Sequence, residues 1–256
     1  MDLNLGGKAF VVGGASRGIG RAIATELVAE GARVLLLARD AHSLDELAGE
    51  LGDAAAPLAV DMGAPDTGER VRATVEARLG RLDGVVVNAG GPPPGEALSL
   101  TDEEWSASYE LLVGGPLRLL RELMPLIGDG GALLFVTSSS VRQPIGGLDS
   151  SNVMRPGVAA LAKVLAREHG PRVRVNSVAP GRIDTDRVRE LDEARAAREG
   201  RTVEEVRADA EANIPLGRYG RPEELARVAA FLLSDAASYV SGAAVQVDGA
   251  SGTALP

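Results

Sequence analysis

This chain of 256 residues contains no cysteine and only two histidines, and aromatic residues make up 3% of it. Without cysteine it can form neither disulfides nor thiolate metal sites. The histidines, His42 and His169, are far apart and have no ligand-like neighbours, so we predict no metal site. Acidic residues outnumber basic ones, 36 to 27: the net charge is -9 and no basic cluster occurs, which argues against a nucleic-acid partner.

Long apolar runs are missing as well, and none reaches the length needed to cross a membrane. The first residues lack the basic and apolar segments of a secretory signal. We therefore expect a cytoplasmic protein without a membrane partner.

The chain does contain short apolar runs that alternate with amphipathic segments, without an internal repeat or linker. This alternation predicts an α/β fold: a doubly wound, mostly parallel seven-stranded sheet with helices on both faces. We expect one domain over residues 1–256. Residues 186–213, rich in Arg, Glu and Ala, predict one or two charged helices inserted into it.

A glycine-rich turn follows the first expected strand, residues 9–12. Gly14, Gly18 and Gly20 allow a tight backbone turn, and apolar residues from Ile19 onward have helical spacing up to Gly31. Such a turn directs free N–H groups and a helix N-terminus at one point, which suits a pyrophosphate. The spacing G-x-x-x-G-x-G differs from the dinucleotide fingerprint G-x-G-x-x-G, and glycine turns can be purely structural. The flanking strand and helix favour the nucleotide site.

Three segments together resemble the short-chain dehydrogenase/reductase family, most of all its 3-oxoacyl-(acyl-carrier-protein) reductase-like members. They are the glycine turn, the Asn-Ala-Gly motif at 88–90, and residues 176–185. Gly13 departs from the family, which usually has Thr there. The resemblance implies a Rossmann fold, a nicotinamide cofactor and a homo-oligomer, either dimer or tetramer. It implies these cofactor-binding residues: Gly14, Ser16, Arg17, Gly18, Ile19, Gly20, Arg39, Asp61, Met62, Asn88, Ala89, Gly90, Pro180, Gly181, Ile183 and Thr185.

The end of the second expected strand bears on the choice of nicotinamide cofactor. Members that use NAD carry an acid where this chain has Ala38, whereas Arg39 and Arg17 suit a 2′-phosphate. We therefore predict NADP(H) over NAD(H), although Asp40 could still accept from ribose hydroxyls. Asp61, after the third expected strand at 57–62, would contact adenine by resemblance or simply cap a helix.

The residues expected to do the chemistry depart from the family. Ser138 matches its catalytic Ser, but Ser151 and Arg155 stand in place of its Tyr and Lys, and Leu112 in place of its Asn. Spacing i to i+4 puts Ser151 and Arg155 on one helical face. A Ser hydroxyl is a poorer acid than a phenol, and a guanidinium does not relay protons.

Other features of this region leave alternatives open. Tyr109 or Asp149 could donate the proton in place of the missing phenol, and Leu112 fits helix packing better than any polar role. Pro156 would kink or break a helix that does not start nearby.

We predict an NADP(H)-dependent oxidoreductase that acts on a carbonyl or alcohol substrate, a small 3-oxoacyl-like molecule, with Ser138, Ser151 and Arg155 at an atypical active site. The alternative is a catalytically impaired NADP(H)-binding protein that acts as a sensor or scaffold. By resemblance, residues 186–213 form the substrate lid; a solvated surface helix is the other interpretation.

Overall fold

The computed structural model describes residues 2–254, and its centre is a sheet of seven parallel strands in the order β3-β2-β1-β4-β5-β6-β7. Apolar, Val-rich runs form the inner strands because both of their faces are buried. The predicted fold class is confirmed. The strands are β1 (Ala9–Gly13), β2 (Arg33–Ala38), β3 (Ala55–Ala59), β4 (Leu82–Val87), β5 (Ile127–Val136), β6 (Val173–Pro180) and β7 (Ala244–Val247).

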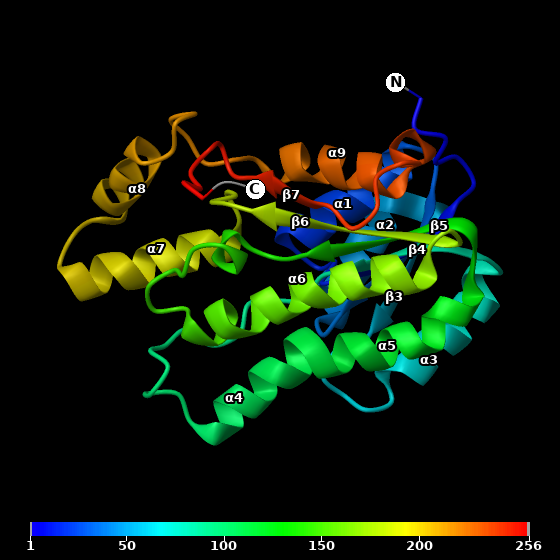
Figure 1. Cartoon of the computed structure of the whole chain (residues 1–256), viewed down its shortest axis with the longest axis horizontal. Helices are drawn as coiled ribbons and strands as arrows, with labels where there is room; N and C mark the ends of the chain where they lie inside the picture. The colour runs from blue at the N-terminus through cyan, green and yellow to red at the C-terminus, as the bar shows by residue number, and fades with distance from the viewer. Residues whose placement is uncertain (1, 255–256) are drawn as a thin grey trace.

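Helices cover both faces of this sheet, and each face has its own apolar core. Figure 1 shows the two layers of helices, with the sheet between them. One layer contains α1 (Gly18–Ala29), α2 (Ala41–Leu51) and α9 (Pro222–Leu233). The other contains α3 (Thr67–Thr74), α4 (Asp102–Tyr109), α5 (Gly115–Leu123) and α6 (Asp149–His169).

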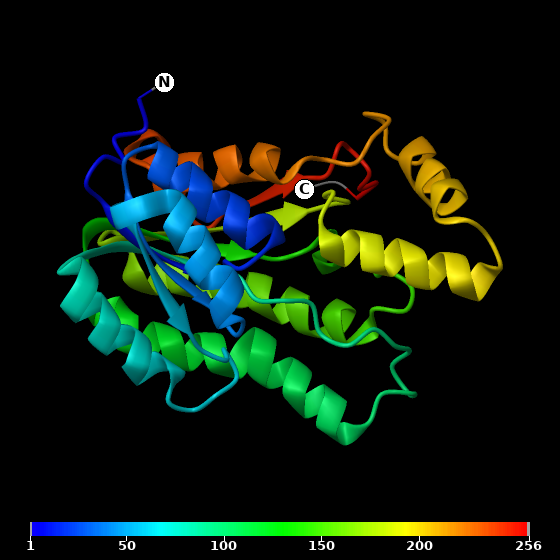
Figure 2. The same ribbon diagram turned by 180° about the vertical axis from the view of Figure 1, so that it is seen from behind.

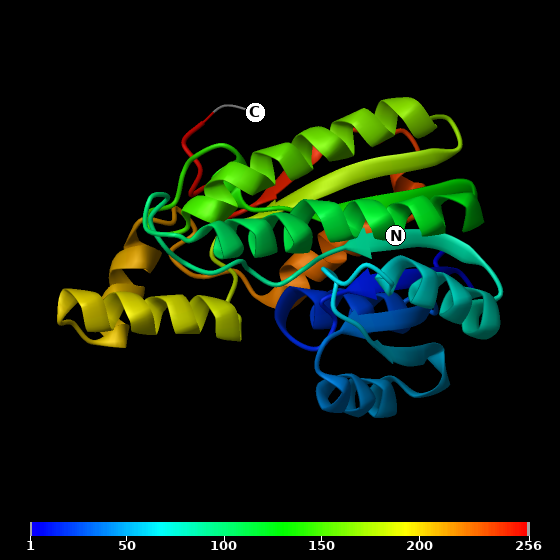
Figure 3. The same ribbon diagram turned by 90° about the horizontal axis from the view of Figure 1, so that it is seen from below.

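Two charged helices, α7 (Asp186–Glu199) and α8 (Val203–Ala212), stand out from one end of the molecule, as Figures 2 and 3 show from two further sides. Thr185 caps α7 by accepting from the Val188 amide, and Thr202 forms a capping box with Glu205 at the start of α8. The expected charged segment is thus two helices separated by Gly200, whose φ is +64°.

Two expectations about the elements need correction. The third strand ends at Ala59 rather than at position 62, because it pairs with β2 only as far as Ala38. Asp61 then lies in a turn, where its Oδ1 accepts from the Gly63 amide at 3.0 Å, and the residue before α3 is Asp66. Asp61 therefore caps a turn rather than a helix.

A π-helical turn at residues 110–114 joins α4 to α5. Leu112 lies in this turn and is 5% exposed, packed in the core beneath α5 and α6. Helix α6 runs continuously through Pro156 because the ring falls on its exposed side, at the cost of one backbone hydrogen bond.

Candidate active site

A cavity of about 920 Å³ opens at the carboxyl ends of the strands. Its lining comes from the segments that follow strands β1 to β6, together with α6, α7 and α8. The strand order reverses between β1 and β4, and ligands of open α/β sheets bind at that switch point. All nineteen residues predicted from the sequence as cofactor-binding or catalytic line this one cavity.

The glycine turn has the backbone that the sequence predicts. Gly14 and Gly18 have φ values of +59° and +57°, which favour glycine. A Cβ at Gly20 would lie 2.1 Å from the Gly14 carbonyl oxygen and 2.8 Å from Asn88 Nδ2. Only a glycine therefore permits the close approach of helix α1 to the turn.

The N-terminus of α1 suits an anion. Its N-cap residue, Arg17, forms no side-chain capping bond, and the first turn of the helix carries no acidic residue. Within the described chain the first N–H groups of α1 therefore lack a side-chain cap, and their residues, 18–20, line the cavity. Asn88 braces the turn from β4, because its Nδ2 donates to the Gly13 carbonyl at 3.0 Å. These features fit a dinucleotide pyrophosphate.

Three charged residues near the end of β2 and the glycine turn differ in their hydrogen bonds and ion pairs. Asp40 accepts from the amides of His42 and Ser43 and from the Ser43 hydroxyl, and these hydrogen bonds lower its pKa below the usual value. Its oxygens thus serve as the N-cap of α2. Arg39 is exposed at the cavity wall and takes part in no ion pair within residues 2–254. Arg17 pairs with Glu190 of α7 at 2.9 Å.

At the other end of the cavity, Ser138, Ser151 and Arg155 lie together. Ser138 follows β5, and its Oγ accepts from the Ser140 amide at 3.1 Å. Ser151 and Arg155 share one face of α6, as their spacing predicts, and Arg155 Nε donates to Ser151 Oγ at 3.0 Å. Arg155 Nη1 donates to the carbonyls of Val136 and Thr137, which fixes the guanidinium against the end of β5.

Burial, and secondarily the nearby charge of Arg187, lower the pKa of Arg155 to about 10. Arg155 therefore stays charged at neutral pH. Its guanidinium donates to three protein acceptors, and the side chain lines the cavity.

The two alternative proton donors lie elsewhere. Tyr109 is 44% exposed and does not line the cavity. Asp149 also lies outside it, accepting from the Ala97 amide and from Asn152 Nδ2. Neither residue is placed to protonate a substrate beside Ser138.

Sequence reasoning missed several residues of the site. Arg187, the second residue of α7, lines the cavity and donates to the Pro92 carbonyl at 3.1 Å. Leu191, Arg195 and Ile214 also reach the cavity from α7 and from the segment after α8. The helical period would have placed Arg187 and Leu191 on one face of α7, but nothing in the sequence says which face looks inward.

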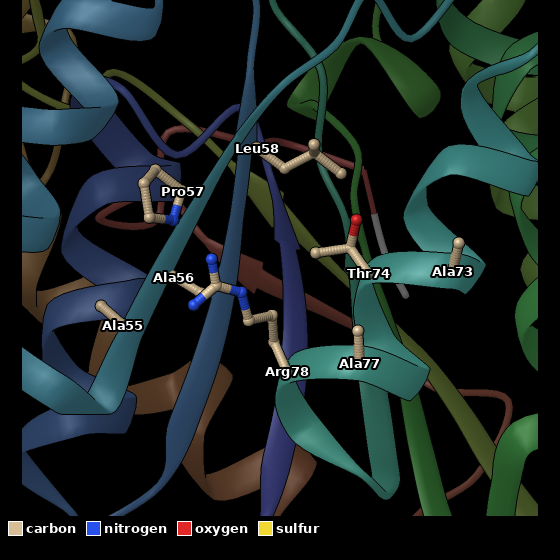
Figure 4. A pocket seen from close by; sticks show the side chains of 8 residues that line it. All are labelled: Ala55, Ala56, Pro57, Leu58, Ala73, Thr74, Ala77 and Arg78. Atoms are coloured by element: carbon tan, nitrogen blue, oxygen red, sulfur yellow. The ribbon is translucent and has the colours of Figure 1, made fainter.

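A second hollow of about 470 Å³ lies at the sheet edge, between β3 and the turn after α3. Figure 4 shows its small side chains, with Arg78 as the one charged group. It holds no pair of groups that could act together on a substrate. No described residues, 2–254, form a cluster of three or more His, Cys, Asp or Glu suited to a metal. None of the helices in that range is both long and apolar enough to span a bilayer.

Comparison with known proteins agrees with this geometry. A family model described as enoyl-(acyl carrier protein) reductase matches residues 14–250. The 3-oxoacyl-(acyl-carrier-protein) reductases of Pseudomonas aeruginosa and Escherichia coli are 35% and 34% identical, each over 96% of this chain and 98% of their own length. The chain belongs to the short-chain dehydrogenase/reductase family. Members are NAD(P)-dependent oxidoreductases, so the predicted family and enzyme class are confirmed.

A solved short-chain dehydrogenase/reductase extends the likeness to the whole fold. L-sorbose reductase from Gluconobacter frateurii, complexed with NADPH and L-sorbose, is 32% identical, covers 100% of both chains and superposes with a TM-score of 0.94. Ser151 and Arg155, in place of the family's Tyr and Lys, are among the positions where this chain departs from the family pattern.

Proposed function

We propose that the protein is an NADP(H)-dependent oxidoreductase that interconverts a carbonyl and an alcohol, with a small 3-oxoacyl-like substrate and an atypical active site. One observation carries the proposal: the glycine turn and the Ser138–Ser151–Arg155 group line the same cavity. A cofactor held by the turn and a substrate oxygen held by the serines would then share one enclosed space.

The preference for NADP(H) rests on the charges at the end of β2. Asp40 has its oxygens engaged by the N-terminus of α2, whereas Arg39 has no carboxylate partner within the described chain. The exposed Arg17–Glu190 pair contributes little stability, so a phosphate can replace Glu190. Arg39 and Arg17 would thus hold a 2′-phosphate. We expect NADPH to bind at least tenfold more tightly than NADH, and Arg39→Ala to remove most of that difference, as measured by nucleotide fluorescence.

The roles of the three catalytic candidates follow from their hydrogen bonds. The nicotinamide, when bound, supplies or accepts the hydride. Both Ser138 Oγ and Ser151 Oγ accept a hydrogen bond from the protein, so each hydroxyl keeps its own hydrogen to donate to a substrate oxygen. The charge of Arg155 stabilises negative charge that develops on that oxygen. Water supplies the proton, because neither serine is as strong an acid as a phenol.

This arrangement predicts slow turnover, since loss of a general acid lowers rates by about 10²–10⁴-fold. Leu112→Asn, Ser151→Tyr and Arg155→Lys, combined in one variant, would restore the family's set of side chains. We expect the folded variant to oxidise NADPH faster than the natural protein with the same carbonyl compound. Unchanged turnover in a folded variant would count against the assignment of this site.

The direct test is to measure NADPH binding by fluorescence and then NADPH oxidation with a panel of ketones and 3-oxoacyl thioesters. Oxidation with any of them supports the proposal. Tight binding without oxidation by any would favour the alternative, an impaired enzyme that acts as an NADP(H)-dependent sensor or scaffold.

The proposal also covers how the chain is organised: one domain over residues 1–256, with residues 186–213 as the substrate lid. Leu191 and Ala210, from α7 and α8, line the cavity and support a covering role. A cytoplasmic location and a homodimer or homotetramer belong to the same proposal. Light scattering after size-exclusion chromatography measures the assembly.

A further inference from the structure

Two of the guanidinium groups that line the cavity, those of Arg155 and Arg187, lie on different helices. Arg155 comes from α6, and Arg187 comes from the first turn of α7. Arg187 Nε lies 3.0 Å from the point where a Cβ on Gly91 would be, so its guanidinium sits against the loop after β4. Both side chains line the same space as Ser138 and Ser151.

These two charges are poorly neutralised by the protein. The hydrogen-bond partners of Arg155 are a serine oxygen and two main-chain carbonyls, all of them uncharged. Arg187 donates to the Pro92 carbonyl, and within residues 2–254 its one ion-pair partner is Glu190, at 3.7 Å. Glu190 lies closer to Arg17, at 2.9 Å, so one carboxylate serves two arginines.

The carboxylates that line the cavity are elsewhere or occupied. Asp40 and Asp61 follow β2 and β3, on the opposite side of β1 from α6. Asp186 lines the cavity but accepts from Arg189, with which it forms an ion pair. An unneutralised pair of cations in a partly enclosed space is costly unless an anion completes it. Guanidinium groups bind carboxylate and phosphoryl oxygens through paired, charge-assisted hydrogen bonds.

We propose that the substrate of this site carries an anionic group, a carboxylate or a phosphoryl group, which Arg187 binds in the field of Arg155. This inference rests on the proposed function and narrows its substrate class to anionic carbonyl compounds, such as short oxo acids. Because Arg187 lies in the first turn of α7, its contact with the anionic group would also bring that turn against the substrate.

The experiment compares each anionic carbonyl compound with a neutral analogue. NADPH oxidation is measured with 3-oxobutanoate against its methyl ester, and with dihydroxyacetone phosphate against dihydroxyacetone. A charge-assisted contact predicts a preference of about ten- to a hundredfold in kcat/KM for the charged member of at least one pair. Preference in the first pair identifies a carboxylate, and preference in the second identifies a phosphoryl group.

Two variants of α7 make the test specific to Arg187. Arg187→Met should lower the preference for the charged member to about one. Arg189→Met is the matched control, because Arg189 is two residues further on, largely exposed and outside the cavity, and it should keep the preference. Equal activity with charged and neutral members in the natural protein would overturn the inference. So would a tenfold loss of NADPH affinity in Arg187→Met with both members slowed alike, because Arg187 would then serve the cofactor.

A binding measurement separates this inference from the proposed function. Butanoate and butanamide are titrated calorimetrically into the protein saturated with NADP⁺. Binding of butanoate or, in a parallel titration, of inorganic phosphate, abolished by Arg187→Met but not by Arg189→Met, supports the anion site even if no substrate turns over. Failure of all these anions to bind at millimolar concentration would contradict it, whatever the outcome of the activity assay.

Discussion

The close approach at Gly20 gives the sharpest test of the proposal that the glycine turn forms a nucleotide site. An alanine at this position would place its Cβ 2.1 Å from the Gly14 carbonyl oxygen and 2.6 Å from its carbon. Both are backbone atoms, so the turn itself has to move rather than a flexible side chain. Overpacking of this kind costs about 1–3 kcal/mol.

That cost should appear in two measurements on Gly20→Ala. Urea unfolding should show a loss of about 1–3 kcal/mol of stability. The displaced turn can no longer direct its N–H groups at a pyrophosphate. We therefore expect the Kd for NADPH to rise at least tenfold, which corresponds to about 1.4 kcal/mol.

Gly49→Ala is the matched control. Gly49 lies within α2, and a Cβ there meets nothing within 4 Å. Alanine should stabilise this helix by about 0.5–1 kcal/mol and leave NADPH binding unchanged. If Gly20→Ala were as stable as the natural protein and bound NADPH equally well, the argument for a sterically required turn would be refuted.

Three further outcomes follow from the same structure. Tyr219→Phe should lower the free energy of unfolding in urea by about 1–3 kcal/mol, because the Tyr219 hydroxyl donates to the buried carboxylate of Asp192. Burial raises the pKa of Tyr219 to about 12, which keeps this donor protonated. Arg218 and the Arg221 amide lower the pKa of Glu224 to about 2 from 4.5. The stability that these contacts give the folded protein is present above the pKa of Glu224 in the unfolded chain, and it is lost as the pH falls towards 2. Acid unfolding of Glu224→Gln should therefore depend less on pH over that range, and an equal dependence would contradict the assignment. NADPH at a hundred times its Kd should stabilise the protein by about 2.7 kcal/mol, which calorimetry would show as a rise in Tm of several degrees. An unchanged Tm would exclude an NADPH site that exists only in the folded protein.

Local patterns predicted much of this structure. The glycine turn, its helix and the buried strands follow from residue types and spacing that act within a few positions of one another. The i to i+4 spacing likewise brought Ser151 and Arg155 together, and their hydrogen bond confirms that they share a face.

The sequence alone did not predict contacts between residues that lie far apart in the chain. Strand β3 ends where its pairing with β2 ends, at Ala38 and Ala59, and the apolar residues of the segment do not reveal that point. Arg187 enters the cavity because α7 packs across the loop after β4, 95 residues earlier in the chain. The same holds for Asp192, which is buried against Arg182 and Tyr219, though its neighbours in sequence suggest a solvated helix.

Arg155 shows how one substitution changes a site without changing its scaffold. A guanidinium at this position satisfies the carbonyls at the end of β5 and remains charged, so the fold is preserved. In the proposed site it would bind and orient a substrate, but a guanidinium does not exchange protons at neutral pH. The chemistry expected of the site is therefore hydride transfer with little help in protonation.

Isotope transfer tests that central claim most directly. The protein is incubated with NADPH deuterated at the transferable position of C4 and with the charged carbonyl compounds above, and the products are examined by mass spectrometry. We predict an alcohol one mass unit heavier, formed by the natural protein and at a much lower rate by Gly20→Ala. Bound NADPH, verified by fluorescence, together with no deuterium in any product would contradict the account.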